Sequence, residues 1–176
     1  MMPKRLALMV LLVGSLLAGT APAHAAPDRG HGAGARAAGG QIDGTAYFSP
    51  VAGDPCPEPP AAYDDYDPLV MQGSLQGCWY TRIETARTTP GGVYLETGQE
   101  LFVGRLDGGE VGTFTTTYRF EAKLDAEGVE VRGRCQHPLV AGSGTGGFAG
   151  ARGRVDFKDI IGDPITYVYR GHIRLP

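Results

Sequence analysis

Apolar and polar residues alternate along most of the chain after residue 40, which is the pattern of strands that bury one face. The clearest case is residues 112–125, where Phe114, Tyr118 and Phe120 share one parity and hydroxyl or charged side chains hold the other. The same pattern predicts further strands at 41–49, 69–85, 91–104, 128–140, 151–160 and 165–175. The segment 69–85 is long enough for one long strand or a bulged pair.

The connections between these segments are short and contain glycine, as at 106–110, 125–128 and 161–164. Such connections are typical of hairpins between antiparallel strands. Seven to nine strands joined in this way predict an all-β fold over residues 41–176, in a single domain. We expect an antiparallel up-and-down barrel, with a β-sandwich as the second choice, because closure removes exposed edge strands.

The N-terminus has the layout of a secretory signal peptide over residues 1–25. Lys4 and Arg5 precede an apolar run, and Ala23, His24 and Ala25 form a small-x-small cleavage site. The apolar run is shorter than the roughly 20 residues of a spanning helix. Residues 26–40 are small and glycine-rich, which predicts a flexible lead-in. We therefore expect a secreted, extracellular protein.

The charge of the chain bears on its partners. The formal net charge is −3, and the predicted signal peptide contains basic but no acidic residues, so the mature chain is more acidic still. Nucleic acids and anionic membranes attract basic surfaces. We therefore expect neither nucleic acid nor a membrane as partner, and the oligomeric state is left open.

Side-chain parity sorts the last two strands into an inner and an outer face. In 165–175, Tyr167 and Tyr169 share the inward parity, whereas His172 lies on the outer face. We interpret His172 as a solvated strand histidine. The other outward residues of these two strands include a basic row: Arg152, Arg154, Arg170 and Arg174.

The strand 128–140 carries the most informative histidine. Val129 and Val131 set the inward parity, which then continues through Cys135 and His137. An inward histidine can orient a ligand in an apolar cavity or act as an acid or base near neutral pH.

The alternative, which we favour, is a core histidine with an ordinary hydrogen-bond partner, because buried polar groups usually find one. Tyr118, Tyr169 or a backbone carbonyl could supply that partner.

Two carboxylates, Glu96 and Glu100, flank a bend at Gly98 where parity is ambiguous. If Glu100 follows Phe102 inward, a buried carboxylate enters the barrel as a general base or ligand anchor. We favour the other arrangement, in which Leu101 and Val103 point inward and Glu100 is solvated, since glutamate is rarely buried without a partner.

Three cysteines lie in the predicted mature chain, at 56, 78 and 135. In an oxidising compartment two of them are expected to pair. Cys56 lies in the proline-rich loop 50–68, and we expect it to be bridged because an unpinned loop of this length is costly to order. Parity places Cys78 outward, and it does not decide which cysteine is the partner of Cys56.

The segment 142–147 matches G-x-G-x-x-G, the dinucleotide-binding pattern. A dinucleotide loop needs a helix after it, and the residues that follow alternate as a strand does. The match is therefore accidental, and no cofactor is expected. The glycines fit a tight reversal between strands, and Phe148 can tuck into the end of the barrel.

The stretch GSGTGGFAGARGRVDF, followed by a last strand pair, resembles the corresponding segment of allene oxide cyclases and dirigent proteins. The upstream stretch ETGQELFVGRLDGGEVGTFTTTYRFEAK is similar in layout to small bacterial members of this barrel superfamily, and the resemblance covers about residues 70–175. It implies an eight-stranded, lipocalin-like barrel with a central cavity. It also implies cofactor-free guidance of cyclisation or radical coupling of a hydrophobic precursor.

The motifs GCWYT and GRCQHP are not part of the plant pattern, and no catalytic residue can be transferred. The alanine, glycine and arginine content, with the A-H-A cleavage site, fits an exported bacterial protein.

Three functions follow as hypotheses. The barrel binds a small hydrophobic or aromatic molecule; or it is a cofactor-free isomerase or cyclase; or it is a filled structural or interaction protein that works through its outer basic row. No cluster has metal-ligand spacing, so no metal is expected. The candidate cavity-lining residues are His137, Tyr118, Phe120, Tyr167, Tyr169 and Glu100.

Overall fold

The computed structural model describes residues 39–49 and 55–176. The predicted signal peptide and most of the predicted lead-in lie outside these residues. The first strand begins at Gly39, so the last two residues of that lead-in belong to the barrel. In the described part of the chain, no helix is long and apolar enough to cross a membrane.

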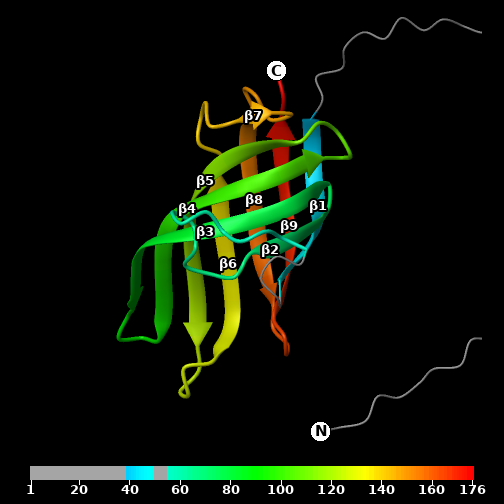
Figure 1. Ribbon diagram of the computed structural model, residues 1–176. Coiled ribbons are helices and arrows are strands. Elements are labelled where there is room, and N and C mark those ends of the chain that lie inside the picture. Colours follow the sequence, from blue (N-terminus) through cyan, green and yellow to red (C-terminus); the bar gives the residue numbers. More distant parts are fainter. Residues whose placement is uncertain (1–38, 50–54) are drawn as a thin grey trace, which may run out of the picture. The chain divides into compact units, whose positions relative to one another are not determined.

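The structure is all-β, as predicted, and its strands close into a barrel (Figure 1). Each strand pairs antiparallel with its neighbours, and pairing of the fourth strand with the fifth closes an eight-stranded up-and-down barrel to which a short ninth strand, β7, is added. This architecture is consistent with that of lipocalins. The strands are β1 (Gly39–Phe48), β2 (Leu69–Gly73), β3 (Leu75–Thr88), β4 (Val93–Leu106), β5 (Gly112–Leu124), β6 (Glu130–Pro138), β7 (Thr145–Gly146), β8 (Arg152–Ile160) and β9 (Thr166–Arg174).

The parity predicted for β5, β8 and β9 is confirmed. Phe114 and Tyr118 of β5, Val155 of β8 and Ile173 of β9 are buried, and His172 is exposed on the outer face. The strict alternation along these strands leaves only one face that can enter the core. The segment 69–85 is a pair of strands, β2 and β3, rather than one long strand.

The parity assigned to the start of β6 is wrong. Val129 is 59% exposed and Val131 is 48% exposed. A register shift is the cause, because Lys123 pairs with Arg132 whereas the next residue of β5 pairs with Glu130, which leaves Val131 as an extra residue. Such a bulge reverses the faces on either side of it, so Glu130 points inward.

Aromatic rings fill one end of the barrel. Phe148, from the glycine-rich segment, is fully buried, and its ring centroid lies 5.0 Å from Phe114 and 5.5 Å from Phe102. Trp79 packs against the other side of these two rings. Because the segment is a reversal whose Thr145 and Gly146 pair with β5, its glycines serve the barrel and not a phosphate group.

A disulfide joins Cys56 to Cys78, so the expectation that Cys56 is bridged is confirmed. The partner that parity left open is the outward-pointing Cys78 of β3, and Cys135 is a free, buried thiol. The bridge fastens the proline-rich loop to the outside of the barrel. A disulfide of this kind is compatible with an extracellular, oxidising compartment.

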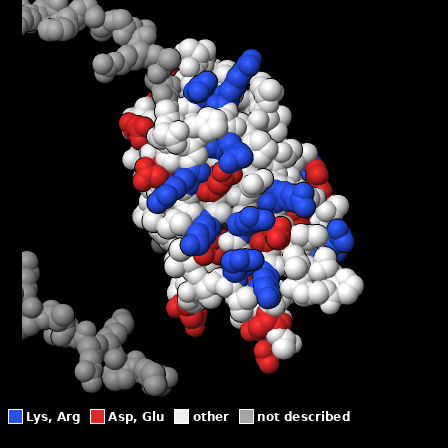
Figure 2. Space-filling model, turned by 180° about the vertical axis from the view of Figure 1, so that it is seen from behind, with Lys and Arg blue, Asp and Glu red and all other residues white. Residues whose placement is uncertain are grey.

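The outer face of β5, β6, β8 and β9 is rich in cations (Figure 2). Its acidic residues are few, and Glu121 and Asp156 each form an ion pair with an arginine of this face. The formal net charge of the whole chain is −3 and gives no indication of this cationic face. The exposed cations here are Arg119, Lys123, Arg132, Arg134, Arg152, Arg154, Lys158, Arg170 and Arg174.

Candidate functional site

The end of the barrel away from Phe148 is hollow, with a cavity of about 230 Å³. Trp79 forms the boundary, because its ring meets Phe102 on the filled side and His137 and Phe157 on the hollow side. The residues around the cavity are Phe48, Tyr66, Leu69, Trp79, Thr81, Glu96, Glu100, Tyr118, Phe120, Glu130, Cys135, His137, Phe157, Asp159 and Tyr167.

Five of the six residues proposed from the sequence line this cavity: His137, Tyr118, Phe120, Tyr167 and Glu100. Tyr169 does not. It is buried in the core, where its hydroxyl accepts a hydrogen bond from the Leu75 N–H (2.8 Å) and donates to the Gln72 carbonyl (3.1 Å). Tyr169 therefore holds the turn between β2 and β3 and takes no part in the cavity.

Glu100 is buried, so the solvated arrangement favoured from the sequence is wrong. The alternation of β4 runs unbroken through Gly98, and Glu96, Glu100 and Phe102 are all buried on the inner face. Gly98 gives this row its room, since a Cβ there would lie 2.6 Å from Cε1 of Tyr118. The bend that made parity ambiguous is a place where a tyrosine ring approaches the backbone closely.

Glu100 forms a buried pair with His137. The Oε2 atom of Glu100 lies 3.1 Å from Nε2 of His137, and the side chains are 7% and 3% exposed. His137 Nδ1 lies 3.1 Å from the Val155 carbonyl oxygen, which only accepts, so Nδ1 carries a hydrogen. A hydrogen bond between Nε2 and Glu100 then requires one further proton, shared between imidazole and carboxylate.

The interpretation of His137 as a core histidine with an ordinary hydrogen-bond partner thus describes only part of its environment. A backbone carbonyl does satisfy one ring nitrogen, but the other faces a carboxylate in the cavity. Threonine hydroxyls hold that carboxylate in place, with Thr116 donating to Oε2 (3.1 Å) and Thr81 to Oε1 (3.4 Å). A fixed proton-sharing pair in an apolar pocket has the composition of an acid–base site.

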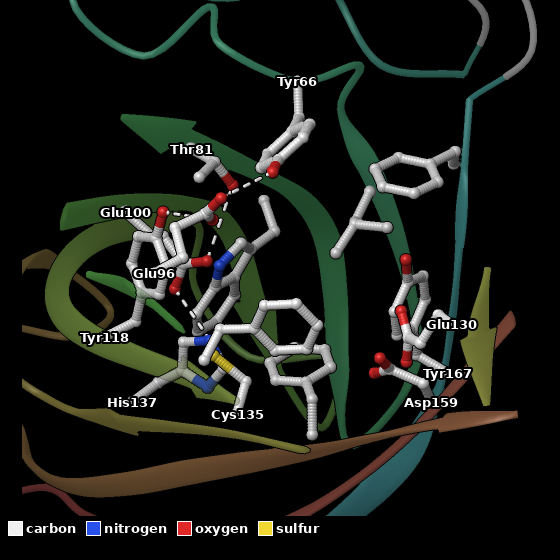
Figure 3. Close-up of a pocket in the computed structure, with 15 residues that line it drawn as sticks. Tyr66, Thr81, Glu96, Glu100, Tyr118, Glu130, Cys135, His137, Asp159 and Tyr167 are labelled. Carbon is white, nitrogen blue, oxygen red and sulfur yellow. Dashed lines mark hydrogen bonds and ion pairs between the residues drawn. The ribbon is translucent and has the colours of Figure 1, made fainter. Parts of the chain in front are cut away.

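Glu96 is surrounded by tyrosines (Figure 3). The hydroxyls of Tyr66 and Tyr118 donate to it at 2.8 and 2.7 Å, and the Tyr94 hydroxyl also donates. Burial, followed by the hydrogen bond to Glu96, raises the pKa of Tyr66 and of Tyr118 well above the usual range. The hydroxyls therefore stay protonated, and the arrangement fits a carboxylate that only accepts.

Tyr66 reaches the cavity from the proline-rich loop, which the disulfide anchors. The Asp65 N–H donates to the Thr81 carbonyl (3.2 Å), and Asp65 Oδ2 accepts from the Ile83 N–H (2.7 Å). Tyr66 is 39% exposed and packs near Phe48, so it marks the mouth of the cavity. No local pattern in the sequence could place this loop residue beside Glu96.

A second carboxyl pair, Glu130 and Asp159, lies across the cavity from His137 (Figure 3). Neither residue is among the site residues predicted from the sequence. Asp159 shares the parity of Phe157 on β8, so the alternation could have found it. Glu130 could not be found in this way, because the bulge at Val131 sets its direction.

Asp159 gives the stability of the protein a pH dependence. Burial, then the hydrogen bond and charge of Glu130, raise its pKa to about 8, from about 4 in an unfolded chain. Between these values the folded protein holds a proton that the unfolded chain has lost, so the free energy of unfolding falls as pH rises through this window.

We therefore expect Asp159→Asn to flatten that dependence, because the amide keeps a donor toward Glu130 and has no proton to lose. Urea unfolding between pH 5 and 9 measures the free energy of unfolding of the wild type and of the variant. If the difference between these two free energies stays constant across the pH window, the expectation is contradicted. Asp156→Asn, on the outer face of the same strand, is the control.

Cys135 is the free thiol of the cavity wall. Burial, with the negative charge of Glu100 as the next cause, raises its pKa well above the usual value. The thiolate is the nucleophilic form, so Cys135 packs as a small apolar side chain at neutral pH. In the described part of the chain, no group of three or more His, Cys, Asp or Glu side chains is placed to hold a metal ion.

No protein-family model, curated protein or solved structure matches the chain. The resemblance to allene oxide cyclases and dirigent proteins therefore rests on the glycine-rich segment and the strand layout. The class of protein that the fold defines is a closed, eight-stranded antiparallel barrel, hollow at one end.

Proposed function

We propose that this protein binds a small apolar or aromatic molecule in the hollow end of the barrel. The observation that carries the proposal is the cavity itself, which has aromatic walls and a few convergent polar groups. Binding sites for small molecules have this composition. A volume of about 230 Å³ is slightly below the range of about 300–1,000 Å³ for drug-sized ligands, which suits a molecule of one or two rings.

The same observation favours binding over a purely structural role. The structural hypothesis assumes a filled barrel, and here the rings fill one end only. We propose that the protein is secreted and binds its ligand outside the cell. The predicted signal peptide and the disulfide support this location.

The second candidate is a cofactor-free isomerase or cyclase, the activity that the family resemblance implies. The proton shared by His137 and Glu100 favours it, because a buried pair can give a proton to one atom of a bound molecule and take one from another. The threonines that hold Glu100 keep the pair fixed. The ligand enters and leaves as isomers, so no redox partner is needed.

Native mass spectrometry of the protein secreted by its own host tests the binding proposal. A discrete extra mass on wild type identifies the ligand. We expect His137→Ala to weaken its binding by about tenfold, because the variant removes part of the cavity wall and leaves the buried Glu100 carboxylate without its partner. His172→Ala, on the outer face of β9, should leave binding unchanged. Equal effects of the two variants would overturn the proposed site.

Incubation of the identified ligand with the protein tests the second candidate. Conversion of the ligand to an isomer by wild type, and loss of that conversion in Glu100→Gln with binding retained, is the expected result. Glu121→Gln, a strand glutamate on the outer face, is the matched control. A ligand recovered unchanged from wild type would leave binding as the function and remove catalysis.

A further inference from the structure

The Glu130–Asp159 pair has no partner of opposite charge. Asp159 is 7% exposed, and in the described part of the chain neither carboxyl group forms an ion pair with a basic side chain. The two groups fill the space above Gly133, where a Cβ would lie 2.0 Å from Asp159 Oδ2 and 2.3 Å from Glu130 Oε1. Both carboxyl groups point into the cavity (Figure 3).

The pair is therefore satisfied only by a proton. Carboxylates are acceptors, so Glu130 and Asp159 can hydrogen-bond to each other only when one of them is protonated. In the structure, Glu130 Oε1 is buried without a hydrogen-bond partner among the described residues. Burial raises the pKa of Asp159 to about 8, so near neutral pH the pair holds one proton and one negative charge.

The cavity as a whole carries uncompensated negative charge. Among the described residues that line it there are four carboxyl groups, one histidine and neither lysine nor arginine. Glu100 shares a proton with His137, and Glu96 accepts from neutral tyrosines only. Two negative charges thus remain, one at Glu96 and one at the Glu130–Asp159 pair. Buried charges without a counter-charge are costly.

We propose that the ligand of this cavity is a small aromatic or apolar amine, whose ammonium group replaces the shared proton and lies between the carboxylates of Glu130 and Asp159. The ring of Tyr167 lies beside the pair (Figure 3), and an ammonium group is attracted to the face of such a ring. The apolar body of the ligand then fills the space toward Trp79 and Phe157. This inference rests on the proposed function and names the class of ligand.

The geometry favours an organic cation over a metal ion. Two carboxyl groups supply too few oxygens for Ca²⁺, which takes six to eight, and in the described residues no third His, Cys, Asp or Glu joins them. Most of the surrounding wall is aromatic or aliphatic, which suits a carbon skeleton attached to the charge.

The test compares two probes of the same shape, 2-phenylethylamine and 2-phenylethanol, on the mature protein by isothermal titration calorimetry. We expect the amine to bind at least about tenfold more tightly at pH 8.5, because the alcohol cannot pair with a carboxylate. The preference should fall as pH drops to 6, since a proton then competes for the pair while the amine stays charged.

Proton counting supplies a second readout. At pH 6.5, titration in two buffers of different ionisation enthalpy should show about one proton released for each amine bound, by linkage. Asp159→Asn should abolish both the proton release and the amine preference. Asp156→Asn, on the opposite face of β8, should keep both.

The outcomes separate the inference from the function on which it rests. Equal binding of amine and alcohol, or an unchanged preference in Asp159→Asn, would overturn the amine subsite and leave a neutral ligand in the cavity. Binding of neither probe at millimolar concentration would count against the small-molecule cavity itself. Binding of Ca²⁺ by the wild type in the same range, lost in Asp159→Asn, would overturn the organic cation in favour of a metal.

Discussion

Replacing Phe148 with alanine should lower the free energy of unfolding by about 3–5 kcal/mol, the usual loss for a buried phenylalanine. Phe148 is fully buried between Phe102 and Phe114. Those rings belong to long, closed strands and cannot move inward to fill the space, so a void remains. Urea denaturation followed by circular dichroism measures the change.

Phe120→Ala is the matched control for this variant. Phe120 is only partly buried and borders an existing cavity, so its truncation adds space where space already exists. We expect a clearly smaller loss than for Phe148→Ala. If the free energy of unfolding falls by as much or more in the control, the packing of Phe148 from the glycine-rich segment is not what stabilises the filled end.

Removing the Cys56–Cys78 bridge should lower the free energy of unfolding by about 3 kcal/mol, on the chain-entropy model for a loop of this length. The cysteines are 22 residues apart and enclose the loop that carries Tyr66. The double variant Cys56→Ala with Cys78→Ala, compared in urea with wild type, measures the loss.

The second consequence of removing the bridge concerns the cavity. The loop is held to β3 by the disulfide and by the bonds of Asp65, so loosening it should free Tyr66 from Glu96. Cys135→Ala, which changes the unpaired cysteine, is the control for thiol loss alone. A double variant as stable as wild type would mean that the hydrogen bonds of Asp65 suffice to fix the loop.

The sequence predicted the strands and most of their faces because alternation is a local property. In β5 every second residue from Gly112 to Tyr118 is buried, and these residues share one face of the strand. The same rule failed at Val131, where an inserted residue changes the register with β5. A single sequence carries no mark of such a bulge, because it depends on the partner strand.

The candidate site was harder to predict because its polar residues are satisfied across the barrel. The sequence alone favours a solvated Glu100, because glutamate is rarely buried without a partner. It is not alone, since His137 and two threonines meet it from other strands. The contact of Tyr66 with Glu96 is harder still to predict, because Tyr66 lies in a loop whose position the disulfide fixes. Partnership of this kind exists only in the folded chain.

The distribution of charge on the barrel wall also bears on how fast a ligand arrives. Cations cover the outside of β5, β6, β8 and β9, whereas the exposed Asp64, Asp65 and Asp67 are sequence neighbours of Tyr66, which lines the cavity. A field of this form repels a small cation from the closed wall and steers it to the opening. The association rate of an amine should therefore fall as salt screens the field, while that of a neutral molecule stays constant.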